Sequence, residues 1–138
     1  MTFLEAESFV LRFSTLTLLL AALVLTACGG GQSGSPSAGS SGGDPAKGKI
    51  VFETGVCITC HTLAGATGAN GITGPALNGI GTRAATRKPN TTAEAYIRES
   101  ETNPNAFVVE GFPRDVMPAW SGTAADLNNL IAFLLEQK

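Results

Sequence analysis

The chemically most distinctive stretch of the chain is Cys57-Ile58-Thr59-Cys60-His61, which places two of the three cysteines and the single histidine within five positions. Two thiols and one imidazole at this spacing are compatible with three kinds of chemistry. The thiols could form a structural or redox-active disulfide, the three side chains could contribute to a zinc site, or the segment could attach haem. The rest of the sequence has to discriminate among them.

Zinc and a redox disulfide lack the sequence context that they need. A structural zinc site uses four ligands, typically in two separated pairs. The chain has no second histidine, and its third cysteine, Cys28, lies at the end of an apolar N-terminal segment. A thioredoxin-like pair needs a β-α-β context, which the sequence does not indicate. A disulfide between Cys57 and Cys60 stays open as an alternative in an exported protein.

Haem attachment accounts for every position of the motif. The two vinyl groups of haem form thioethers with two cysteines less than one helical turn apart, and the next residue, His61, then supplies the proximal nitrogen to iron. Cys-x-x-Cys-His is the pattern of c-type haem attachment, so we expect Cys57, Cys60 and His61 to hold one covalent haem c.

The second axial ligand follows by elimination. No other histidine exists, and of the two methionines Met1 belongs to the leader, which leaves Met117. It lies in Asp115-Val116-Met117-Pro118-Ala119-Trp120, a proline-stiffened loop before the last expected helix. An isolated methionine usually fills a core, but this one's uniqueness and its loop setting favour binding to iron. A thioether ligand favours Fe(II) and raises the reduction potential.

The N-terminal part is predicted to export and tether the chain. Residues 1–27 combine Arg12 with the apolar run Leu16–Leu25, as in a signal peptide. Leu25-Thr26-Ala27-Cys28 resembles the lipobox of bacterial lipoproteins, which implies that Cys28 is lipidated; an uncleaved membrane anchor is the alternative. Residues 28–43 are rich in Gly and Ser and should form a flexible linker. The folded domain is expected to be 44–138.

The domain should be all-α, because no alternating β pattern appears in it. Asp44-Pro45 predicts the start of a helix that continues to Thr54. The capping box that begins at Thr91 predicts a helix to about Thr102, and a third helix should begin at Thr123. Residues 62–90 show no periodicity and are expected to form one long loop. A loop of this length is uncommon in a small domain, and three short helices form only a thin core. An apolar group inside the domain would account for both features, and haem is such a group.

On these motifs the domain resembles class I monohaem cytochromes c. The resemblance implies that Gly48 lets the last helix cross closely, with Phe52, Leu130 and Phe133 packed around the crossing. It also implies that the carbonyl of Pro75 accepts a hydrogen bond from the proximal imidazole. The segments that carry the likeness are Gly48–Phe52, Cys57–His61, Gly74–Leu77 and Met117-Pro118.

A narrower likeness is to the cytochrome c domain of some cytochrome oxidase second subunits. It rests on Tyr96–Ser100, Asn103–Asn105 and Gly111–Met117, although no membrane hairpin or copper-binding domain precedes them here. A haem subunit of a quinol-oxidising complex, such as alternative complex III, is a further possibility. Arg83, Arg98 and Trp120 are either ligands of the haem propionates or ordinary structural residues.

These observations predict an electron carrier and not an enzyme. We expect single-electron transfer between respiratory or photosynthetic complexes, on the outer face of the cytoplasmic membrane or in the periplasm. The partners would be redox proteins and, through the lipid, the membrane. A net charge of −2 with one Trp and one Tyr gives no sign of nucleic-acid binding. The alternatives are a fixed haem subunit of a larger complex and a haem-based gas sensor.

Overall fold

The computed structural model describes residues 42–138. The expected signal peptide, Cys28 and the linker up to residue 41 lie outside these described residues. Five helices form the described part: α2 (Pro45–Thr54), α3 (Cys57–Cys60), α4 (Ile80–Arg87), α5 (Ala93–Thr102) and α6 (Ala124–Leu135). The only extended pairing in residues 42–138 is an isolated bridge between Thr62 and Asn70. The prediction of an all-α domain is therefore confirmed.

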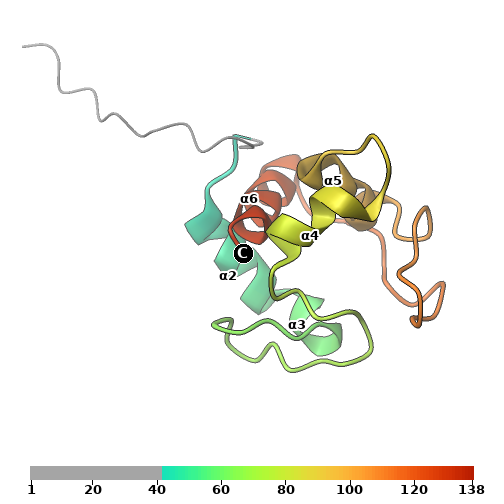
Figure 1. Ribbon diagram of the computed structural model, residues 1–138. Coiled ribbons are helices and arrows are strands. Elements are labelled where there is room, and N and C mark those ends of the chain that lie inside the picture. Colours follow the sequence, from blue (N-terminus) through green and yellow to red (C-terminus); the bar gives the residue numbers. More distant parts are fainter. Residues whose placement is uncertain (1–41) are drawn as a thin grey trace, which may run out of the picture. The chain divides into compact units, whose positions relative to one another are not determined.

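The first and last helices cross at a glycine, as expected. In Figure 1, α6 runs across α2. A Cβ atom on Gly48 would lie 1.9 Å from the backbone oxygen of Asn129 and 2.7 Å from the Cβ of Phe133, so no larger residue fits at this crossing. One turn further along α2, the rings of Phe52 and Phe133 pack with their centroids 5.7 Å apart. Phe52, Leu130 and Ile131 are the largest fully buried side chains of the described part.

Local side-chain caps set where the helices begin. The carboxylate of Asp44 accepts hydrogen bonds from the first amides of α2, and Thr123 accepts one from Asp126 N at 3.1 Å in α6. At α5 the cap is Thr92, whose hydroxyl accepts from Ala95 N at 3.1 Å, and not Thr91 as the capping box predicted. The hydroxyl of Thr91 donates instead to the carbonyl of Pro89 at 3.2 Å. The helix itself ends at Thr102, where the sequence placed it.

Helix α4 corrects the expectation of one long loop over residues 62–90. It follows Gly79, which has φ +70°, and it packs against the end of α6. A Cβ on Gly81 would lie 2.2 Å from the carbonyl oxygen of Leu135, and the amide of Gly81 donates to Gln137 O at 2.8 Å. The helix therefore depends on the C-terminal segment, which lies far away in the sequence, and only Ile80 and Ala84 supply an apolar face.

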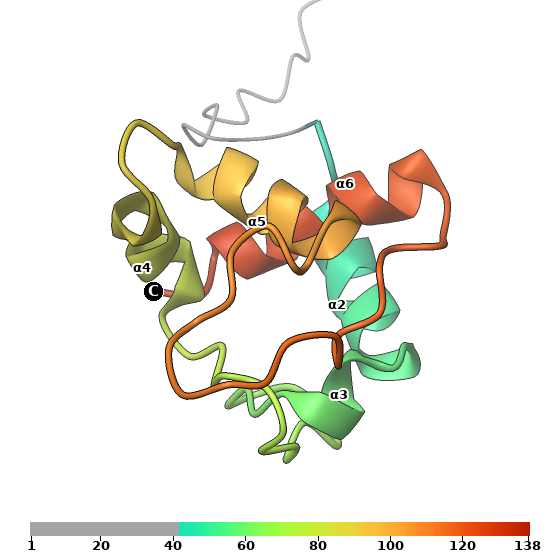
Figure 2. The ribbon, with the colours of Figure 1, turned by 90° about the vertical axis from the view of Figure 1, so that its right-hand side faces the viewer.

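The long segment between α5 and α6 shapes the functional side of the domain. In Figure 2 this segment leaves the end of α5 and runs toward α3 before it turns back into α6. Its backbone rejoins the helices where the amide of Trp120 donates to Glu101 O at 2.7 Å. Over residues 42–138 there is no helix of the length and hydrophobicity that a bilayer crossing requires.

Candidate functional site

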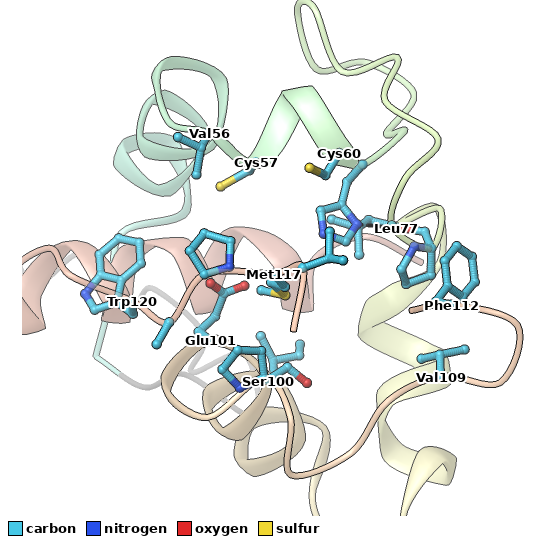
Figure 3. A pocket seen from close by; sticks show the side chains of 18 of the residues that line it. Val56, Cys57, Cys60, Leu77, Ser100, Glu101, Val109, Phe112, Met117 and Trp120 are labelled. Atoms are coloured by element: carbon cyan, nitrogen blue, oxygen red, sulfur yellow. Dashed lines mark hydrogen bonds between the residues drawn. The ribbon is translucent and has the colours of Figure 1, made fainter. Parts of the chain in front are cut away.

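A cavity of about 720 Å³ lies between α3, the loop that follows it, the end of α5 and the segment that leads to α6. This volume falls within the roughly 300–1,000 Å³ typical of ligand and cofactor sites. Most of its walls are apolar, with Phe52, Leu77, Ile97 and Phe112 among them. Figure 3 shows the side chains that point into it. Such a cavity can accept a large apolar group with a few polar contacts.

One wall is formed by the short helix α3, which presents both cysteines. In Figure 3 the sulfur atoms of Cys57 and Cys60 face the same space. Both thiols are free, and both side chains are partly buried. The helix ends at once after Cys60, because His61 takes an extended conformation while its amide still donates to Cys57 O at 2.9 Å. The two thiols and the imidazole therefore line one cavity.

The loop after α3 holds the imidazole of His61. Its Nδ1 lies 2.7 Å from the carbonyl oxygen of Pro75, so Nδ1–H donates and Nε2 is left as the free nitrogen. Gly74 lies against the ring: a Cβ there would be 2.5 Å from Cε1 of His61. The amide of Gly74 donates to Cys60 O at 2.8 Å, which ties this loop back to α3. The hydrogen-bond contact that the resemblance implied for Pro75 is thus present.

Met117 comes to the cavity from the other side of the domain. It lies in the segment between α5 and α6, and Figure 3 shows its sulfur inside the cavity, away from the two cysteines and close to α5. Pro118 follows it, and Val116 before it is exposed. Residues far apart in the sequence, Cys57–His61 and Met117, thus line the same apolar space.

Two acidic residues, Glu101 and Asp115, line this largely apolar space. Burial raises the pKa of Glu101 to about 7. Burial, and second the charge of Glu101, raise the pKa of the Cys57 thiol to about 11, so this thiol is protonated at neutral pH. Glu101 was not among the functional residues predicted from the sequence. The available signal was its position four residues after the buried Ile97, which places it on the inward face of α5.

The three residues considered for the haem propionates all have structural partners. Arg83 donates to the carbonyls of Ala76 and Asn78, and Arg98 to Glu94 and Asn128 on α5 and α6. Neither arginine lines the cavity. Trp120 does line it, but its indole Nε1–H donates to Thr123 O at 3.2 Å and its ring packs on the hydrophobic core. The geometry therefore favours the structural alternative for all three.

The side chains around the cavity discriminate among a disulfide, a zinc site and haem attachment at Cys57–His61. The thiols of Cys57 and Cys60 are not joined, and in the part of the chain from residue 42 onward no three His, Cys, Asp or Glu side chains gather as metal ligands. Two free thiols beside an imidazole held at Nδ1, in an apolar cavity that a thioether also enters, fit a covalently attached haem. The fold and the site define a class I monohaem cytochrome c.

The comparison with known families gives the same class and a particular family. The family model described as cytochrome c oxidase, cbb3-type, subunit III matches residues 43–134, and the chain belongs to this family of cytochrome c domains. The domain binds haem c through Cys57 and Cys60, and its family performs haem-based electron transfer, typically outside the cytoplasm. The family is named for a third oxidase subunit, whereas the narrower resemblance was to second subunits. A search of the curated proteins finds no match.

Proposed function

We propose that the protein is a lipid-tethered, monohaem electron carrier with His61 and Met117 as the axial ligands. The observation that carries the proposal is that Met117 and the Cys57–His61 segment line one apolar cavity although they lie far apart in the sequence. Haem supplies a one-electron Fe(III)/Fe(II) couple when bound. The carrier has redox proteins as partners, transforms no small-molecule substrate and is not an enzyme.

The chain's own residues perform three tasks in this proposal. Pro75 and Gly74 fix the orientation of His61, so that Nε2 faces the cavity while Nδ1 donates to a carbonyl. Met117 offers a neutral, soft donor, which favours the reduced state and raises the potential. The apolar walls exclude water and lower the local dielectric constant, which also disfavours the extra positive charge of the oxidised state.

The tether is proposed from the sequence of the N-terminal part. The signal peptide 1–27, a lipidated Cys28 and a Gly/Ser-rich linker to residue 43 would keep the domain at a membrane surface outside the cytoplasm. A flexible chain of this length has an r.m.s. span of roughly 20 Å. We propose that the domain shuttles electrons between respiratory or photosynthetic complexes within this reach.

The optical spectrum of the haem-loaded, full-length protein tests the axial ligands. We expect a low-spin c-type spectrum, a weak long-wavelength iron–thioether band in the oxidised state, and no reaction of the reduced state with carbon monoxide. Met117→Ala should abolish the band and allow carbon monoxide to bind. The matched control is Ile72→Ala, which shortens an exposed apolar side chain outside the cavity lining and should change neither property. A wild-type protein that binds carbon monoxide rapidly would refute the assignment of Met117.

A fixed subunit of an oxidase is the second candidate, and the description of the matching family favours it. Size separation after mild detergent extraction distinguishes the two. A carrier elutes alone with its haem absorbance, whereas a subunit elutes with the haem absorbance of a larger complex. Replacement of Cys28 by Ser tests the tether in the same preparation, since an unlipidated chain should leave the membrane fraction.

A further inference from the structure

Two side chains close the base of the segment that carries Met117. The Nδ2 amide of Asn105 donates to Oδ1 of Asp115 at 2.8 Å, and the backbone amide of Asp115 donates to Oδ1 of Asn105 at 2.9 Å. The guanidinium of Arg114 donates in addition to the backbone oxygen of Asn105 at 2.9 Å. Three hydrogen bonds therefore join the two ends of residues 105–115.

The backbone of Asp115 depends on this arrangement. Its φ is +62°, in the left-handed region, where residues other than glycine are uncommon and where Asp and Asn are better tolerated than the rest. The bonds to Asn105 supply local hydrogen-bond partners for this conformation. Met117 follows two residues later, so the direction in which the chain leaves Asp115 determines where the thioether lies.

A second anchor holds the other side of Met117. The amide of Trp120 donates to Glu101 O at 2.7 Å, at the end of α5. At the start of the segment, the ring of Phe107 packs edge-on against Tyr96 of α5, with centroids 5.7 Å apart. Met117 thus lies between two attachment points, Asp115 and Trp120. The first of these is made by side chains and can be removed by substitution without altering the core.

We propose that the Asn105–Asp115 pair is a positioning device that keeps the thioether of Met117 in the cavity. The inference rests on the proposed axial role of Met117 and extends it to the two residues that hold the base of its segment. Without the pair, the segment from Asp115 to Pro118 gains conformational freedom while α2, α5 and α6 stay packed. Met117 then leaves the iron more often, and the reduced protein becomes accessible to external ligands.

The test uses the haem-loaded, full-length protein. In Asn105→Ala, which removes both side-chain bonds, we expect the rate of carbon monoxide binding to rise on the order of 10-fold, because each such bond contributes about 0.5–1.5 kcal/mol. The thioether band should also fade at a lower temperature than in the wild type. Asp115→Gly keeps the left-handed backbone and removes only the carboxylate, so it should have an intermediate effect.

Two controls separate positioning from general loss of stability. Asn70→Ala removes an exposed amide side chain on the proximal side of the domain and should match the wild type. Gly48→Ala strains the helix crossing, away from the segment, so at temperatures where it stays folded its carbon monoxide rate should also match the wild type. An equal rise in Gly48→Ala would overturn the proposal, since general loosening would then explain the effect.

The possible failures are distinguishable. If Asn105→Ala behaves as the wild type while Met117→Ala loses the thioether band, the positioning role is wrong and the axial ligand stands. If Met117→Ala keeps the band, the axial assignment is wrong and the positioning role falls with it. If Met117→Ala loses the thioether band and Asn105→Ala binds carbon monoxide faster than the wild type, the axial role of Met117 and the positioning role of the Asn105–Asp115 pair are both supported.

Discussion

A methyl group added at Gly74 should disturb the imidazole of His61 directly. A Cβ at this position would lie 2.5 Å from Cε1, 2.9 Å from Nδ1 and 3.0 Å from Nε2, whereas ordinary contacts begin at 3.4 Å. The ring must therefore retreat by up to 0.9 Å, or the loop must move away from it. Either movement lengthens the 2.7 Å contact between Nδ1 and the carbonyl of Pro75. Gly74→Ala thus adds strain and weakens one hydrogen bond at the same time.

The expected magnitude follows from these two effects. Overpacking of this kind costs about 1–3 kcal/mol, and a lost hydrogen bond about 1 kcal/mol. For a domain of this size, the sum of about 2–4 kcal/mol corresponds to a fall in melting temperature of roughly 8–32 °C. A weaker bond at Nδ1 also makes the imidazole a poorer donor to iron, which favours the reduced state. The reduction potential should therefore rise, by roughly tens of millivolts.

Thermal unfolding and redox titration of the haem-loaded protein measure both effects. Gly65→Ala serves as the control, because Gly65 has φ +81° and no atom within 4 Å of its Cβ position. It should lose about 1–2 kcal/mol through left-handed strain alone and keep the wild-type potential. A wild-type melting temperature and potential in Gly74→Ala would refute the argument that the glycine is needed for the contact with His61.

Two further substitutions test the core and the buried acid. Gly48→Ala should cost at least about 3 kcal/mol in chemical denaturation, because its Cβ would lie 1.9 Å from Asn129 O; a midpoint near the wild type would contradict the close crossing. Burial disfavours the charged form of Glu101 and raises its pKa from 4.5 to about 7. The contribution of Glu101 to the stability of the folded domain is therefore full below pH 4.5, where Glu101 is neutral in both the folded and the unfolded state, and this part of the stability is lost as the pH rises through 7. Glu101→Gln should remove this pH dependence and be more stable at pH 8 by at most about 3 kcal/mol, less where water reaches the carboxylate; equal pH profiles would contradict the assignment.

The predictions from sequence were accurate where local chemistry decides the structure. Asp44 and Thr123 cap their helices through side-chain bonds to amides two or three residues ahead, and such bonds are visible in the sequence. Haem c attachment was equally predictable, because Cys57, Cys60 and His61 lie within five consecutive positions. The error of one residue at Thr92 has the same origin: two adjacent threonines offer the same cap, and only the turn before the helix selects one of them.

The parts that the sequence did not predict depend on distant contacts. Helix α4 is stabilised by the close approach of Gly81 to Leu135 and by the bond to Gln137, which no local pattern shows. Glu101 becomes part of the cavity wall only because the segment before α6 folds over it. The pairing of Asn105 with Asp115 spans only ten positions, but it crosses a loop without periodicity, so no sequence pattern predicts it.

The two sides of the cavity are therefore held by different kinds of interaction. The side of Cys57–Pro75 is organised by one short helix and the loop bonded to it, through contacts that span at most 14 residues. The side of Met117 is organised by contacts to α5, among them the bond from Trp120 to Glu101. In the proposed function, His61 is therefore the ligand that the helix and its loop hold in place. The segment that carries Met117 is the adjustable part of the site, where we expect substitutions to change ligand exchange without loss of the haem.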